Sequence, residues 1–191
     1  MNGSAGTLKD WQALRDTTGI LSLLRTAEEL GVAEERVLLG TQIRVESLER
    51  PFATARAWQE LALLRNLQEL RPDVSLGLRA VPFYDLDALG VLGLGMASSS
   101  SLEDAFAFAG RYQSFGLLFS RIRTRKLGGA LTITLHEREV PEDCQRFCID
   151  RGLAVATQHV RSLAREHLVP ERVSMRGSAA GVAQDYRRFF G

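Results

Sequence analysis

The stretch from Leu117 to His136 has the pattern of a β-hairpin, and it constrains the fold more than any other part of the chain. Residues Leu117–Arg125 alternate between two faces, and residues Ala130–His136 alternate in the same way. Between them, Gly128-Gly129 supplies the residues that a tight turn with positive φ angles favours. The segment therefore predicts two neighbouring antiparallel strands.

Amphipathic helices are predicted around this hairpin, because apolar residues recur there every three or four positions. They are Ile20–Leu30, Ala33–Leu39, Thr54–Leu70, Leu86–Ala97, Leu102–Tyr112, Pro141 to about His167, and Ala180–Phe189; a short strand is predicted at Arg172–Arg176. Ser101 precedes one of these helices as an N-cap, with Asp104 in the first turn.

Helices that come first and antiparallel strands that follow indicate an α+β fold rather than a doubly wound sheet. The predicted plan is an N-terminal helical subregion followed by a helix-strand-strand-helix-strand unit with a small antiparallel sheet. The helical part covers residues 20–100 and the α+β part covers residues 101–191. Residues 1–19 are expected to be a flexible leader, since Gly3, Ser4 and Gly6 lie in a polar stretch.

Composition favours a single globular domain in the cytoplasm. The chain has 191 residues, 45% of them apolar, and a net charge of +1, so no strong field favours nucleic acid or a membrane surface. The N-terminal residues lack the apolar region of a signal peptide, and Cys144 and Cys148 are expected to be free thiols in a reducing compartment. The longest apolar stretch, Leu86–Ala97, is shorter than the roughly 20 residues that cross a bilayer.

Motifs for catalysis, metals or cofactors are not found in the sequence. It has no phosphate-binding G-x-x-x-x-G-K-[ST] loop, no G-x-S-x-G elbow and no spaced set of metal ligands. We therefore expect no enzyme activity, no metal and no cofactor. An enzyme would need His136, His159 or a cysteine to lie in a cleft beside a perturbed carboxylate.

The segment Leu21–Leu39 imitates a helix-turn-helix, with Ala27, Gly31 and Val37 at the usual small, turn and apolar positions. The second helix would begin at Ala33-Glu34-Glu35. Two carboxylates at the end that should meet phosphate oppose DNA binding. The pattern thus favours a plain helical hairpin.

Three arginines, Arg121, Arg123 and Arg125, share one face of the first predicted strand, opposite Thr132 and Thr134. Guanidinium groups in a row can bind an anion or a partner domain. The alternative is a solvated outer face, the common state of antiparallel sheets. Both interpretations stay open at this point.

A larger pattern resembles a known bacterial family. It consists of Leu89–Ser99, Ser101–Ala105, Arg111-Tyr112, Leu23–Gly31, Gly40-Thr41 ahead of Ile43, Glu60–Arg65 and Tyr186–Gly191. In order and spacing these segments are similar to the N-terminal, arabinose-binding-like domain of AraC-type transcription regulators, in the branch that includes regulators of ornithine use. The resemblance extends from about Ile20 to Gly191, with Ser101 where the family usually has threonine.

The resemblance implies a regulatory domain that binds a small-molecule effector of unknown identity, forms a homodimer, or does both. It also implies that promoter DNA is bound only through a helix-turn-helix domain that this chain does not contain. We expect an effector between the helical part and the sheet, since aromatic groups near glycine-rich segments commonly line pockets. The candidate lining residues are Phe83, Tyr84, Tyr112, Phe115 and His159.

The alternative is a protein–protein interaction module that dimerises or docks on another domain and binds no small molecule. A cavity of a few hundred Å³ in the structure would favour the effector site, whereas a solid core would favour the interaction module.

Overall fold

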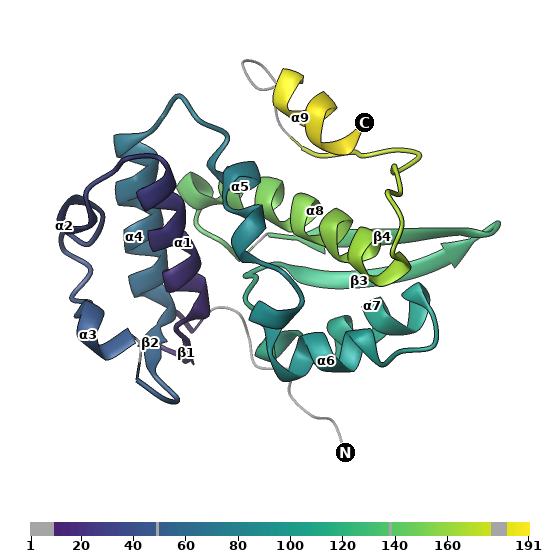
Figure 1. The fold of residues 1–191 in the computed structure, drawn as a ribbon, viewed down its shortest axis with the longest axis horizontal. Coiled ribbons are helices and arrows are strands. Elements are labelled where there is room, and N and C mark those ends of the chain that lie inside the picture. Colours follow the sequence, from purple (N-terminus) through teal and green to yellow (C-terminus); the bar gives the residue numbers. More distant parts are fainter. Residues whose placement is uncertain (1–9, 49, 138, 177–182) are drawn as a thin grey trace.

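The protein consists of a helical part and an α+β part that lie side by side (Figure 1). The structure is a computed structural model, and it describes residues 10–48, 50–137, 139–176 and 183–191. Its helices and two small antiparallel sheets confirm the predicted α+β class. Within the described ranges, no helix is long and apolar enough to cross a membrane.

Short strands and helices make up the helical part. They are β1 (Leu14–Asp16), α1 (Thr18–Glu29), α2 (Glu34–Val37), α3 (Val45–Leu48), β2 (Thr54–Arg56) and α4 (Ala57–Leu70). Strand β1 pairs with β2 in antiparallel register, with Leu14 opposite Arg56. Residues 10–19 were placed in the leader by sequence, but they form this strand and the start of α1, because β2 supplies a pairing partner 40 residues away. The rest of the expected leader, residues 1–9, lies outside the described residues.

The predicted helical hairpin around Gly31 is present, and its second helix is only one turn long. Gly31 adopts a φ of 66°, which ends α1. Val37 of α2 is buried, and the Asn66 side chain of α4 donates hydrogen bonds to the carbonyls of Val37 (2.8 Å) and Leu39 (2.7 Å). Helix α2 is therefore tied into the core of the helical part.

The middle of the chain turns repeatedly before the hairpin. It contains α5 (Leu76–Arg79), the 3-10 turns η1 (Val81–Phe83) and η2 (Asp87–Leu89), and α6 (Val91–Ala97). The helix predicted over residues 86–97 is thus broken at Gly90, whose φ is 54°. Close packing through glycine is confirmed at Gly93, where a Cβ would lie 1.8 Å from the Leu86 carbonyl oxygen.

Helix α7 (Leu102–Arg111) begins as predicted at Ser101, whose Oγ accepts a hydrogen bond of 3.1 Å from the Asp104 amide. After η3 (Gln113–Phe115) the hairpin follows, with β3 (Arg121–Leu127) and β4 (Ala130–His136) joined at Gly128-Gly129. The turn was predicted correctly, but the first strand starts four residues late. Leu117 and Phe119 lie in an irregular segment before the strand, and both side chains are buried in the larger core. Their alternating spacing therefore reflects packing on the core and not a β-strand.

Helix α8 (Glu142–Ala164) is the central element of the structure, and it contacts α4, α5, α7, β4 and the final helix α9 (Ala183–Phe190) (Figure 1). The predicted strand at 172–176 was wrong, because no strand lies beside it in the described residues. Its apolar residues Val173 and Met175 instead pack against the main core. Residues 177–182, at the start of the predicted last helix, lie outside the described residues.

Two apolar cores meet along α8. The larger core joins α1, α4 and α5 to the first half of α8, and includes Leu64, Val81 and Phe147. The smaller core lies between α6, α7, the hairpin and the second half of α8, around Met96 and Phe106. The seam between these cores is where the candidate site lies.

Candidate functional site

A buried arginine, Arg151 of α8, lies at the centre of the larger core with a side chain only 1% exposed. Its Nη1 donates hydrogen bonds to the Tyr84 hydroxyl (2.9 Å) and to Glu60 Oε1 (3.4 Å). Arginine is almost never fully buried without a partner, since the cost of removing its charge from water is large. The Glu60 carboxylate of α4 supplies the opposing charge.

Glu60 is itself buried, with 3% of its surface exposed, and lies between two arginines. Its Oε2 is 3.8 Å from Arg15 Nε of β1, and its Oε1 faces Arg151. Helix α1 approaches this carboxylate at Gly19, where a Cβ would lie 2.8 Å from Oε1. Glycine at this position therefore leaves room for a charge inside the core.

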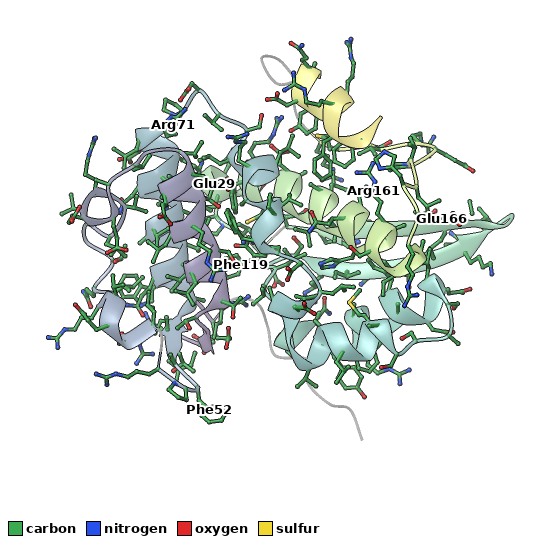
Figure 2. All side chains as sticks on the ribbon, in the orientation of Figure 1. Glu29, Phe52, Arg71, Phe119, Arg161 and Glu166 are labelled. Carbon is green, nitrogen blue, oxygen red and sulfur yellow. The ribbon has the colours of Figure 1, made fainter. Side chains whose placement is uncertain are left out.

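Aromatic rings surround the Arg151 guanidinium on several sides. Its central carbon is 4.9 Å from the ring centre of Phe147, 5.0 Å from that of Tyr84 and 5.8 Å from that of Phe119. Arg15 lies over the Phe119 ring at 4.5 Å, and Figure 2 shows Phe119 at the junction of the two parts. Cation–π contacts thus add to the ion pair in holding the two parts together.

Tyr84 and His159 connect this cluster to the seam between the cores. Burial raises the pKa of the Tyr84 hydroxyl to about 12, although Arg151 opposes the shift, so the hydroxyl stays protonated. His159 Nε2 donates a hydrogen bond of 2.8 Å to the Tyr84 carbonyl. Burial lowers the pKa of His159, which therefore carries the neutral imidazole at neutral pH.

A small apolar cavity of about 30 Å³ opens at the seam. Its lining residues come from both cores and from the hairpin: Tyr84, Leu89, Leu92, Met96, Phe106, Ala109, Gln113, Gly116, Leu117, Leu118, Ser120, Ile122, Leu135, Val155, Ala156 and His159. The volume suffices for one or two water molecules and is well below the few hundred Å³ of a typical metabolite site. In this conformation the seam between the two cores is therefore nearly filled by side chains.

Buried polar atoms without partners gather beside this cavity. Four buried side-chain atoms of the described residues lack a hydrogen bond, and three of them are Ser120 Oγ, Glu137 Oε1 and Arg151 Nε. Burial raises the pKa of Glu137, and the nearby Ser120 hydroxyl opposes this shift without a hydrogen bond of normal geometry. Unpartnered buried groups of this kind require an explanation.

The structure brings two of the five predicted ligand-binding residues together, because Tyr84 and His159 both line the cavity. Phe83 is half-buried against the larger core, and its carbonyl accepts a hydrogen bond from the Ser22 hydroxyl. Tyr112 is 40% exposed on the outer side of α7 and packs on Phe108 at a centroid distance of 4.7 Å. Phe115 lies in η3, and its side chain is outside what the structure describes.

The arginine row lies on the outer face of the hairpin, as its alternation indicated. Arg123 and Arg125 are exposed, and they pair across the strands with Thr134 and Thr132. Arg121 is half-buried and its Nη2 forms an ion pair with Glu139 at 3.1 Å. The row therefore lies on the opposite face of the hairpin from Ile122 and Leu135, which line the cavity.

Sequence reasoning missed Glu60 and Arg151, the two residues that carry the buried charges. A signal was available for each. Glu60 falls among Ala57, Leu61 and Leu64 on the apolar stripe of α4, where a solvated glutamate does not belong. The same reasoning applies to Arg151 beside Phe147 and Cys148 on the buried side of α8.

The two cysteines, His136 and His159 are the groups that an enzyme would need to have in a cleft, and the structure shows the surroundings of each. Burial raises the pKa of Cys144 to about 11 and that of Cys148 to about 12, so both thiols stay protonated. No group of three or more His, Cys, Asp or Glu side chains in the described part of the chain could hold a metal ion. His159 is occupied by a backbone carbonyl, and His136 is exposed on β4.

Comparison with known families places this arrangement in context. The sequence profile described as the arabinose-binding domain of AraC transcription regulators, N-terminal, matches residues 31–191. The chain belongs to this family. The AraC-type regulator domain thus includes Glu60, Tyr84, Arg151 and the cavity within its matched residues.

Two similar proteins are described as uncharacterised HTH-type transcriptional regulators, one of Mycobacterium bovis and one of Mycobacterium tuberculosis. Each is 27% identical to the AraC-type domain over 133 residues, which is 69% of this chain and 39% of the relative. The chain therefore spans about two fifths of the length of these bacterial regulators.

Proposed function

We propose that this AraC-type domain is the sensing part of a cytoplasmic transcription regulator, and that a small-molecule effector binds in the seam cavity. The observation that carries the proposal is the position of the cavity, between two cores that share α8 and beside buried polar atoms without partners. Promoter DNA would be bound by a separate domain, as in HTH-type regulators. No catalytic role is proposed.

Effector binding requires the cavity to widen, since about 30 Å³ is too small for a metabolite. Met96 is the most adaptable side chain of the cavity wall, because it is unbranched and has several accessible rotamers. Helix α6, which carries Met96, is short and begins after the positive φ of Gly90. The effector would therefore select a minor, open state in which α6 has shifted.

Helix α8 provides a route from the cavity to α9. Val155 and Ala156 line the cavity, and five residues before Val155, on the same helix, Asp150 accepts a hydrogen bond of 2.5 Å from the Tyr186 hydroxyl of α9. A displacement of α8 would change this contact. The regulatory signal would then be the position of α9 on the surface of the domain.

The proposal is tested by a thermal-shift screen of amino acids, sugars, nucleotides and short organic acids at millimolar concentration. A specific binder should raise the melting temperature, because it binds only the folded state. Ala156→Val, which fills the cavity, should abolish the shift, whereas Ser162→Val on the exposed side of α8 should retain it. Stabilisation that survives in the Ala156→Val variant would contradict the assignment of the cavity.

A second candidate function is dimerisation through α6. Val91 is 85% exposed and Leu94 is 68% exposed, three residues apart on one side of α6. The small cavity also favours an interaction module over a preformed pocket. Sedimentation velocity should show a dimer that Leu94→Glu weakens, and Leu127→Glu at the exposed hairpin tip is the matched control. A monomer at all concentrations would contradict this second function.

A further inference from the structure

The hairpin of β3 and β4 is a sheet of two strands, so each strand has one long edge that the other strand does not cover. The register shows which backbone groups lie on these edges. Leu127 is opposite Ala130 across the two-residue turn, which makes this pair a hydrogen-bonded one. Hydrogen-bonded and non-hydrogen-bonded pairs alternate along an antiparallel ladder. The N–H and C=O groups of Leu131, Ile133 and Leu135 therefore point away from β3.

The edge of β3 is protected by the chain that precedes it. The same alternation turns the backbone of Ile122 outward, and its N–H donates a hydrogen bond of 3.0 Å to Gln113 Oε1. Helix α7 covers the same residue, since a Cβ at Gly110 would lie 3.1 Å from the Ile122 carbonyl oxygen. Strand β3 also carries Arg125 and Lys126, and charges of this kind oppose the addition of another strand.

The edge of β4 is built differently. Figure 1 shows β4 on the side of the hairpin away from α7, which contacts β3. In the described part of the chain, no hydrogen bond from outside the hairpin reaches the outward groups of Leu131, Ile133 and Leu135. Strand β4 contains no Asp, Glu, Lys, Arg or Pro, the residues that commonly prevent pairing at an edge. Such an edge is suited to take up another strand.

Helix α8 contacts β4 through side chains on one face of the strand. Leu135 Cδ1 would lie 2.8 Å from a Cβ at Gly152, and Ile133 packs on the smaller core together with Ala156 and Val160. The outward backbone groups instead point along the plane of the sheet. Helix α8 and an added strand would thus use different sides of β4.

The sequence of β4 is complementary to itself. In antiparallel pairing about a two-fold axis at Ile133, this residue lies opposite its counterpart, and Leu131 lies opposite Leu135 of the second copy. All three residues have outward backbone groups, so each pair would exchange two hydrogen bonds. On the exposed face, Thr132 would lie opposite Thr134 of the second copy, and β-branched side chains favour such pairs.

Charge favours this antiparallel orientation. Arg125 and Lys126 lie at the tip of the hairpin, and the segment Glu137–Glu139, with two carboxylates and one arginine, follows β4 at its other end. Parallel pairing of two β4 strands would bring the two cationic tips together, where they would repel each other. Antiparallel pairing puts each tip at the end of the other β4 from which the acidic segment continues.

We propose that β4 pairs with β4 of a second copy of this chain and forms a continuous four-stranded antiparallel sheet. This interface differs from the α6 surface and does not rest on effector binding in the seam cavity. A single strand edge buries less than the ~1,200 Å² at the lower limit of a standard interface. The dimer should therefore be weak and dissociate on dilution.

Two double variants at the exposed Thr132 and Thr134 test the pairing and its register. Thr132→Glu with Thr134→Glu should raise the dissociation constant of the dimer at least tenfold, because each new glutamate would oppose another in the second copy. Thr132→Glu with Thr134→Lys should retain the dimer, since opposite charges would then meet. Sedimentation velocity from micromolar to millimolar protein measures the dissociation constant, and thermal melting verifies that both variants fold.

Amide hydrogen exchange resolved by NMR gives a second readout, which a dimer through another surface would not change. The amides of Leu131, Ile133 and Leu135 should exchange at least tenfold more slowly above the dissociation constant than below it, because they are bonded only in the dimer. The Thr132 and Thr134 amides, which bond to β3 in both states, are the internal control. Leu94→Glu on α6 should leave this pattern unaltered.

Each contrary outcome has a definite meaning. A domain that stays monomeric up to millimolar concentration would overturn the inference, even if an extended peptide added to β4, because the edge would then belong to another partner. A dimer that Thr132→Glu with Thr134→Glu leaves unchanged would overturn it as well. A dimer that Leu94→Glu dissociates would overturn it in favour of the α6 surface. None of these outcomes affects the effector cavity, which Ala156→Val tests separately.

Discussion

Arg151 Nη1 and Glu60 Oε1 lie 3.4 Å apart inside the protein and connect α8 to α4. Both side chains are less than 5% exposed, so water cannot replace either partner. A buried ion pair seldom stabilises a protein more than apolar residues would, but the loss of one partner leaves an isolated charge. The pair therefore fixes how the helical part joins the α+β part.

Single substitutions in this pair should be strongly destabilising and should not add. We expect Glu60→Gln and Arg151→Met each to lower the free energy of unfolding by about 3 kcal/mol, because the first leaves the buried Arg151 without an opposing charge and the second leaves Glu60 with only Arg15, at 3.8 Å. The double variant should lose at least about 1 kcal/mol less than the sum. Urea unfolding of the unaltered protein, the two single variants and the double variant measures the coupling energy between the two residues. If the losses of the single variants simply add up in the double variant, the two residues are not coupled.

Gly77 of α5 should not tolerate alanine. A Cβ there would lie 2.6 Å from Asp150 Cβ and 2.7 Å from the Arg151 backbone nitrogen, and backbone atoms of α8 cannot move aside cheaply. We expect Gly77→Ala to cost about 2 kcal/mol of stability. Gly152→Ala is the matched comparison, since its Cβ would meet the end of the flexible Leu135 side chain. Its unfolding free energy should stay within about 1 kcal/mol of the unaltered protein, and equal losses would refute the explanation.

The Tyr186 hydroxyl should control how firmly α9 is held. It donates to Asp150 and accepts a hydrogen bond of 2.5 Å from Arg146 Nη2. We expect Tyr186→Phe to weaken the docking of α9 by about 1–2 kcal/mol, so that its amides exchange roughly tenfold faster. Hydrogen exchange with mass spectrometry measures this, with exposed Arg187→Ala as the control. Uniformly faster exchange along α8 as well would indicate global destabilisation instead.

Local sequence patterns correctly predicted those elements that are determined by residues close to one another in the sequence. The Ser101 cap and the Gly128-Gly129 turn were placed correctly, because hydrogen bonding and backbone conformation at these sites depend on neighbouring residues. The predicted strand at 172–176 failed because a strand exists only with a partner. The alternation of Val173 and Met175 came from packing on the core.

The site was less predictable than the fold because its contacts are long-range. Tyr84 and His159 were chosen for their chemistry, and both line the cavity. The pairing of Glu60 with Arg151 joins residues 91 positions apart, and each has an ordinary helical sequence around it. A charged residue on an apolar stripe indicates that a partner is needed, but periodicity alone cannot identify that partner.

His159 should make the stability of the domain depend on pH near neutrality. Burial lowers its pKa in the folded state below the ordinary value of 6.5, so the unfolded chain binds the proton more readily. The free energy of unfolding should therefore fall as the pH drops below about 6.5 towards the folded pKa, by up to about 1.4 kcal/mol per pH unit.

Substitution separates this effect from other titrations. His159→Gln keeps a side-chain donor for the Tyr84 carbonyl but does not titrate, so its loss of stability between pH 7.5 and about 5.5 should be smaller. His167→Gln, at an exposed position, is the matched control. The raised pKa of Glu137 acts in the opposite direction, but it is common to all three proteins and cancels in the comparison. Parallel pH profiles for His159→Gln and the unaltered domain would show that the buried imidazole is not the group that titrates.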